Sequence, residues 1–81
     1  MDDNEIHERL NQLLEEEHEL RERLSRDEIT PDEEQTRVRE IEVERDQCWD
    51  LLRQRDALRE AGRNPDEAKV RPPGEVEGYL Q

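Results

Sequence analysis

Apolar residues recur at regular intervals along the first third of the chain. They are separated by four, three, seven and four positions and comprise Ile6, Leu10, Leu13, Leu20 and Leu24. Such spacing places side chains on one face of an α-helix and follows the heptad pattern of a coiled-coil seam, which Glu17 interrupts. The pattern predicts one amphipathic helix over about residues 3–25.

A second apolar stripe follows a short break in the pattern. The segment Thr30-Pro31-Asp32-Glu33 carries the signals of a helix start: Thr30 suits the N-cap, Pro31 the first turn, and Glu33 can close a capping box. The stripe itself comprises Val38, Ile41, Arg45, Cys48 and Leu52, widened near its end by Trp49, Leu51 and Leu58. Gly62 is typical of a C-cap, so a second helix is predicted over about residues 31–61.

The connection between the two helices is only about five residues long, which leads them to lie antiparallel. We therefore expect an all-α fold, an antiparallel two-helix hairpin over residues 1–62 that packs like a coiled coil. Glu17 and Arg45 would fall near mid-length, where their pairing could fix the alignment, although a shift by one turn also satisfies the pattern. One hairpin buries little apolar surface, so two copies are expected to pair as a homodimeric four-helix bundle.

Residues 63–81 are expected to form a tail. Asn64-Pro65-Asp66-Glu67 repeats the capping signature and predicts a short helical turn over residues 65–70, which Pro72 and Pro73 then prevent from continuing. Burial of the few apolar side chains of this tail would about balance the entropy cost of ordering it, so we expect it to be loosely attached and available to a partner. The candidate partner-binding residues are Trp49, Val76, Tyr79 and Leu80.

Composition limits what such a fold can do. Of the 81 residues 47% are charged and only 28% are hydrophobic, too few to surround a globular core. The formal net charge of −12 would repel phosphate backbones and anionic membranes, so neither nucleic acid nor a membrane is expected as a partner. No stretch is long enough to span a bilayer, the N-terminus lacks a secretory signal, and a single cysteine cannot form an internal disulfide. These features predict a cytoplasmic protein.

Several blocks of the sequence resemble a known family. They are the EITPDEE turn, the DQCWDLLRQR block at residues 46–55, the NPDEAKVRPP stretch and the terminal VEGYLQ. In these blocks the chain is similar over nearly its whole length to short actinobacterial proteins catalogued as a domain of unknown function. The resemblance implies an actinobacterial, cytosolic protein and a full-length chain, and it implies no site residues.

Three groups of residues along the helices could carry chemistry, and each has a simpler explanation. Glu15 and His18 have the spacing of a carboxylate and imidazole pair of metal ligands, but they fall on the outer surface, where no second helix completes a coordination shell. His7 and His18 lie about 16 Å apart along a helix and cannot share one ion. Cys48 lies on the seam beside acidic residues, and both surroundings raise a thiol pKa, so packing is expected of it rather than reactivity.

A fourth group is the expected hairpin tip, which gathers the acids Asp27, Glu28, Asp32 and Glu33. An acidic tip on a slender rod resembles, in shape alone, the bacterial transcript-cleavage factors that enter the secondary channel of RNA polymerase. The chain has no glycine-rich phosphate loop and no cysteine cluster, and two helices cannot enclose a substrate. We expect no catalytic residue, no cofactor and no metal.

The function predicted is therefore a non-enzymatic protein-interaction module, an adaptor or regulator whose acidic rod engages a protein with a basic surface. A structural homodimeric four-helix bundle is the alternative. A hairpin acting on RNA polymerase, or a metal-binding helical protein, is a second alternative.

Overall fold

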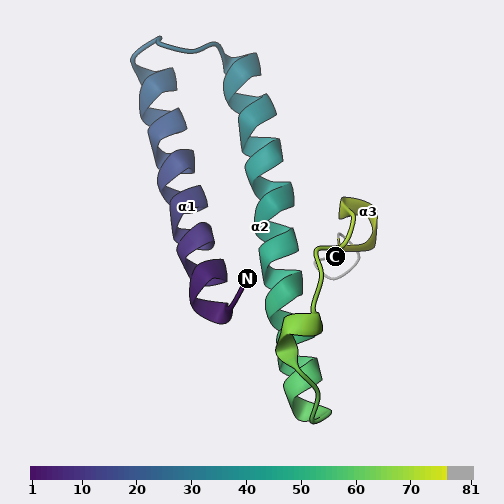
Figure 1. Ribbon diagram of the computed structural model, residues 1–81. Helices are drawn as coiled ribbons and strands as arrows, with labels where there is room; N and C mark the ends of the chain where they lie inside the picture. The colour runs from purple at the N-terminus through teal and green to yellow at the C-terminus, as the bar shows by residue number, and fades with distance from the viewer. Residues whose placement is uncertain (77–81) are drawn as a thin grey trace.

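The computed structural model describes residues 1–76. The chain forms two long antiparallel helices, followed by residues 65–76, which turn back along the second helix and are called the returning segment. Helix α1 spans Asp3–Ser25 and helix α2 spans Pro31–Glu60, followed by the 3-10 turn η1 at Pro65–Glu67 and the short helix α3 at Pro73–Val76. The predicted all-α two-helix hairpin is confirmed (Figure 1). Because α2 is longer than α1, its C-terminal part extends past the start of α1, and the returning segment packs there (Figure 1).

The N-terminal ends of both helices are capped by side chains. Asp2 accepts a hydrogen bond from the Glu5 backbone N–H at 2.8 Å, and the Glu5 carboxylate accepts one from the Asp2 N–H at 3.1 Å, which completes a capping box. Thr30 caps α2 as predicted, because its hydroxyl accepts from the Glu33 N–H at 3.1 Å and Pro31 is the first helical residue.

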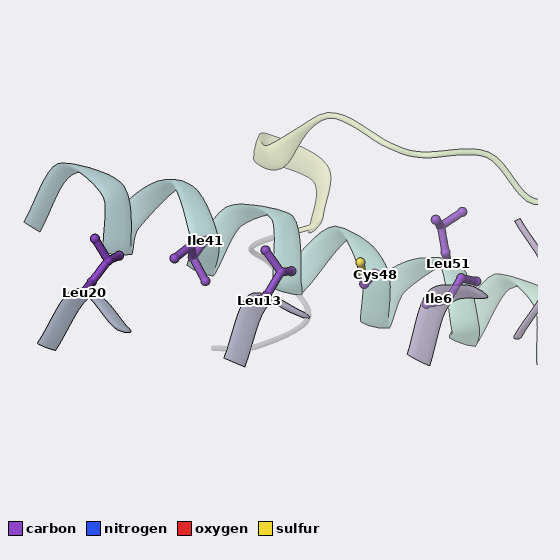
Figure 2. Close-up of a cluster of buried hydrophobic side chains, with 6 residues drawn as sticks. All are labelled: Ile6, Leu13, Leu20, Ile41, Cys48 and Leu51. Atoms are coloured by element: carbon purple, nitrogen blue, oxygen red, sulfur yellow. The ribbon is translucent and has the colours of Figure 1, made fainter. Parts of the chain in front are cut away.

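The core lies between the helices as a single row of side chains. Its buried members are Ile6, Leu13, Leu20, Ile41, Cys48 and Leu51 (Figure 2). Leu10, Val38 and Leu52 pack against this row and remain partly exposed. The predicted stripes are therefore the ones that form the core, although Leu51 is more deeply buried than its neighbour Leu52.

Ion pairs on one edge of the hairpin define the register of the two helices. Arg9 binds Glu44 through two nitrogens, with Nη2 at 2.8 Å from Oε1, and Arg37 binds Glu16 at 2.7 Å. Glu16 lies seven residues after Arg9, and Arg37 lies seven residues before Glu44. The two pairs are thus the same contact repeated after one heptad, with the positions of acid and base exchanged.

The opposite edge also repeats, here after two heptads and with both acids on α1. Arg45 lies 3.9 Å from the Glu17 carboxylate, and Arg59 lies 2.6 Å from Asp3, fourteen residues along each helix. The predicted pairing of Glu17 with Arg45 is confirmed. The Glu17 side chain is 13% exposed, whereas Arg45 is half-exposed at 43%, so the carboxylate enters the seam and the guanidinium covers it from outside.

The segment after η1 runs back along the side of α2 that faces away from α1 (Figure 1). The Gln54 side chain forms two hydrogen bonds with the backbone of Lys69. Its amide nitrogen donates to the Lys69 carbonyl at 2.8 Å, and its oxygen accepts from the Lys69 N–H at 3.2 Å. Gln47 donates to the Arg71 carbonyl at 3.2 Å, and Ala68 packs against the core. The expectation of a loosely attached tail is therefore wrong for residues 65–71, because these side chains pair with its backbone and offset the cost of ordering it.

Candidate functional site

Trp49 is the candidate binding residue whose side chain the structure describes. Its side chain lies on α2, on the side of the hairpin away from the returning segment, and is 44% exposed. His7 of α1 packs edge-on against the indole, with 6.2 Å between ring centroids and 79° between ring planes. Leu14 follows His7 by one heptad on α1 and is 55% exposed. An indole and a leucine side chain therefore face solvent on the same side of the molecule.

Of the other three candidate binding residues, one lies in the described part of the chain. Val76 is the last residue of α3, which contacts α2. Tyr79 and Leu80 lie outside the described residues. Val70 is the one large apolar residue of the returning segment with a described side chain, and it is 61% exposed.

A buried ion pair fastens the returning segment to α2. Asp50 is only 2% exposed, and both its oxygens accept from the Arg71 guanidinium, with Nε at 2.9 Å from Oδ2. Gln54 donates to the same carboxylate at 2.7 Å. The Arg71 hydrogen bond lowers the pKa of the Asp50 carboxyl, against the opposing effect of burial, and Gln54 lowers it further.

A second cluster joins three parts of the chain around Arg55. This side chain is 5% exposed and donates to the Asp3 carboxylate, to the Met1 carbonyl at 3.0 Å, and to the Pro65 carbonyl at 3.2 Å. It also reaches Asp66 of η1 at 3.0 Å. Hydrogen bonds from Arg59 and Arg55 lower the pKa of the Asp3 carboxyl. Arg55 therefore connects the N-terminus, α2 and η1.

Sequence reasoning did not single out Asp50 and Arg55 as buried ion-pair residues, although both lie in the distinctive block at residues 46–55. Arg55 continues the α2 stripe seven residues after Cys48, so its position on the buried face was readable from the spacing. Gln47, Asp50 and Gln54 are three and four residues apart, a polar stripe on another side of the same helix. A polar stripe is ordinarily a solvated one, and nothing local indicates that an extended segment will cover it.

The four acids of the hairpin tip take part in local structure. Asp27 adopts a left-handed backbone with φ of 57° in the turn that ends α1. Glu28 pairs with Arg26 at 3.2 Å and lies 3.7 Å from Arg23. Asp32 and Glu33 are in the first turn of α2, where negative side chains interact favourably with the helix dipole.

The residues considered for metal or thiol chemistry remain apart. Glu15 and His18 are both exposed on α1, and within residues 1–76 no three His, Cys, Asp or Glu side chains gather in a way that could hold a metal ion. Cys48 is a buried free thiol, 5% exposed, and burial followed by the nearby Glu44 carboxylate raises its pKa. A thiol of raised pKa carries little thiolate, the reactive form.

The described surface also includes one shallow open groove along α2, lined by Arg37, Arg39, Glu40, Val43, Glu44 and Gln47. Two of its side chains, Arg37 and Glu44, already form ion pairs with α1. None of the described helices has the length and apolar character needed to cross a lipid bilayer.

Comparison with known proteins gives a family and no activity. A family model described as "Protein of unknown function (DUF2630)" matches residues 2–81. The chain is 52% identical over 77 residues to an uncharacterized protein of Mycobacterium tuberculosis, a span of 95% of this chain and 88% of the relative. An uncharacterized protein of Mycobacterium bovis matches with the same identity and coverage. These relatives are actinobacterial, as the resemblance implied, and no solved structure matches the chain.

Proposed function

Because the chain belongs to the DUF2630 family of proteins of unknown function, we propose its role from its surface: it is a non-enzymatic interaction module that engages a basic surface on another protein. The lone thiol Cys48, which has no partner cysteine in the sequence, fits action in the reducing cytoplasm. No catalytic role is proposed.

The observation that carries the proposal is an acidic ridge on the outer side of α1. We define the acidic ridge as the exposed residues Glu5, Glu8, Glu15, Glu19 and Glu22. They are three, seven, four and three positions apart and so share the side of the helix opposite the buried stripe. The residues interleaved with them along most of this side are Asn4, Asn11, Gln12 and His18. At the C-terminal end of the ridge, Arg26 lies 4.0 Å from the Glu22 carboxylate.

The rest of the described structure explains why this ridge keeps its charge. Ten arginines form ion pairs within the described chain, most of them in the hairpin edges, the tip and the returning segment. The positive charges of these arginines are therefore already paired with acids of the same chain. The acid excess behind the net charge of −12 is left on the outer surface, where it favours and steers approach of a basic partner.

The proposal is tested by capture of partners from a native lysate with the full chain, followed by cross-linking and mass spectrometry. The variant E8Q/E15Q removes two charges from the acidic ridge, and E33Q/E60Q removes two exposed charges from the ends of α2 as a matched control. We expect the wild type and the control to recover the same protein, E8Q/E15Q to lose most of it, and recovery to fall as salt increases from about 50 to 300 mM. Recovery of no specific protein, or equal recovery by E8Q/E15Q, would show that the ridge is not a docking surface.

A further inference from the structure

One broad side of the hairpin carries a second pair of heptad stripes that the returning segment leaves uncovered. We call it the open face. On α1 it starts at Asp3 and continues at alternating steps of four and three residues to Leu24. On α2 it starts at Gln35 and continues at steps of three and four to Arg59. Stripes of this kind on both helices are the pattern by which a hairpin packs against two further helices in a four-helix bundle.

The centre of the open face is apolar. Leu14 and Trp49 are 55% and 44% exposed, and Leu10 and Leu52 are half-buried beside them. Helical side chains lean toward the N-terminus of their own helix, so in this antiparallel pair Leu14 leans toward the open end and Trp49 toward the tip. The two side chains therefore lean toward each other along the rod, with His7 packed against the indole.

The open face is also nearly neutral. Its two stripes contain four acids (Asp3, Glu17, Glu42 and Asp56) and three arginines (Arg21, Arg45 and Arg59), a balance of −1 against −12 for the whole chain. Ion pairs lie on both sides of the apolar centre, Asp3 with Arg59 at 2.6 Å toward the open end and Glu17 with Arg45 at 3.9 Å toward the tip. Because the open face carries little net charge, it would repel the same face of an identical chain only weakly.

We propose that the open face is the interface with a second copy of this chain, giving an antiparallel four-helix bundle with Trp49 and Leu14 of both copies at its centre. A basic partner would be attracted to the acidic ridge and gains nothing from a neutral, apolar surface. A second copy presents the same neutral surface and the same apolar centre, which a two-fold axis can superpose.

The size of the face fits an interface of modest affinity. Twenty-three residues of α1 extend about 34 Å, and two helices side by side are about 20 Å wide. The resulting face, about 700 Å² per copy, is slightly below the roughly 800 Å² per partner of standard interfaces. We therefore expect dissociation constants in the micromolar range, about 1 to 50 μM.

The test is sedimentation equilibrium of the full chain over about 1 to 200 μM, with two variants that make the same change at exposed apolar residues. L14E places a carboxylate at the centre of the open face, and V70E places one on the returning segment. We expect the wild type and V70E to dimerise alike and L14E to raise the dissociation constant at least about tenfold. Circular dichroism verifies that L14E remains helical, which its exposure leads us to expect.

Two further readouts separate this interface from the proposed function. Trp49 is the only tryptophan, so its emission should shift to shorter wavelength as the wild type dimerises and should not shift in L14E over the same range. Dimerisation should strengthen with salt, because two chains of −12 repel each other, whereas binding of a basic partner weakens. The ridge variant E8Q/E15Q should dimerise at least as well as the wild type. A monomer throughout the range, or L14E that dimerises as tightly as V70E, would overturn the proposal.

Discussion

Asp27 and Gly62 end the two long helices with the same backbone geometry, although only one of them is a glycine. Each has a positive φ, 57° for Asp27 and 72° for Gly62. After α1 the Asp27 N–H donates to Leu24 and the Glu28 N–H to Arg23; after α2 the Gly62 N–H donates to Arg59 and the next N–H to Leu58. Both ends are Schellman motifs, in which a left-handed residue satisfies the last carbonyls of the helix.

The replacement D27G should stabilise the protein. Glycine adopts the left-handed region without the steric cost of a Cβ, which more than offsets the entropy that it adds to the unfolded chain here. We expect the free energy of unfolding to rise by about 0.5–1 kcal/mol, measured by urea denaturation. The converse change G62A should lower it by about 1 kcal/mol, although a Cβ at Gly62 would meet no atom within 4 Å, so any loss there comes from the backbone alone. A destabilising D27G would mean that the aspartate side chain supports this turn.

Cys48 is expected to be inert in the folded protein. It is 5% exposed, and burial and Glu44 both raise its pKa, so the thiolate is scarce and inaccessible. At pH 8 we expect a disulfide reagent to label it at least about 100-fold more slowly than in urea-unfolded chain, at a rate set by opening of the hairpin. Labelling of the folded protein as fast as the unfolded chain would show that the seam opens freely around this residue.

Periodicity revealed the apolar residues of the hairpin seam and could have placed Arg55 on the same face, but it gave no sign that the charges of Asp50 and Arg55 would be buried. Ile6, Leu13 and Ile41 could be placed in the core because a helical face is a local property of the sequence. Asp50 and Arg55 are buried because segments distant in sequence cover them, at Arg71 and at Asp3 and Asp66. Burial of an ionised group depends on partners that surround it, and a charged residue in a helix ordinarily indicates a solvent-exposed position.

At the scale of elements, the two long helices and their antiparallel order were predictable, and their register was not. Cap signals such as Thr30-Pro31 mark a helix start locally, and a short turn limits the pairing to a hairpin. A shift by one turn would keep the apolar faces together. It would separate Arg9 from Glu44 and Glu16 from Arg37, so the ion pairs at the edges distinguish the observed register from its neighbours.

The returning segment is the element that sequence reasoning misjudged. Its attachment depends on hydrogen bonds between α2 side chains and an extended backbone, and on the ion pair of Asp50 with Arg71. Neither kind of contact leaves a periodic pattern in the segment itself. The spacing of Gln47, Asp50 and Gln54 on α2 was the available signal.

Removal of Arg71 should therefore loosen the segment and destabilise the whole protein. In R71A the buried Asp50 carboxylate loses both hydrogen bonds from the guanidinium and keeps the one from Gln54, and we expect the free energy of unfolding to fall by about 2 kcal/mol. The control R63A breaks an exposed pair with Glu67 and should cost less than about 0.5 kcal/mol. Thermal denaturation measures both.

A double-mutant cycle then isolates the pair itself. D50N/R71A removes both charges, so it should be less destabilising than the sum of D50N and R71A. If R71A costs no more than R63A, the segment is loosely attached as the sequence first suggested, and Val70 and its neighbours would be available to a partner.

At the scale of the whole molecule, the charge is divided between two sides of a slender rod. The principal extents of the described chain are 51, 24 and 16 Å, so every side chain is close to the surface and to other charges. Most arginines pair with acids along the hairpin, exposed acids form the ridge of α1, and the open face is close to neutral. A net charge of −12 on so small a body opposes folding through self-repulsion, and the internal ion pairs oppose that repulsion.

Mild acidification should therefore stabilise the protein before strong acidification unfolds it. Protons bound between pH 7 and pH 5 reduce the net negative charge and weaken the repulsion, so helix content and melting temperature should rise at low salt. The carboxyls of Asp3, Glu44 and Asp50 have pKa values lowered below 3.8, 4.5 and 3.8. A group with a lowered folded pKa stabilises the fold above its unfolded pKa, so these three contributions persist through the rise and are lost only as the pH falls below about 4.

Salt separates the two limbs of this profile. At about 1 M NaCl the repulsion among exposed charges is screened, so the rise between pH 7 and pH 5 should disappear. The loss below pH 4 should remain, because the Asp50 carboxylate is 2% exposed and its bond to Arg71 is screened much less. In D50N the acid limb should become shallower, since a neutral amide has no proton to gain. A melting temperature that falls steadily from pH 7 to pH 5 at low salt would mean that attraction between glutamates and arginines outweighs repulsion over the whole surface, and that the net charge does not limit the stability of this fold.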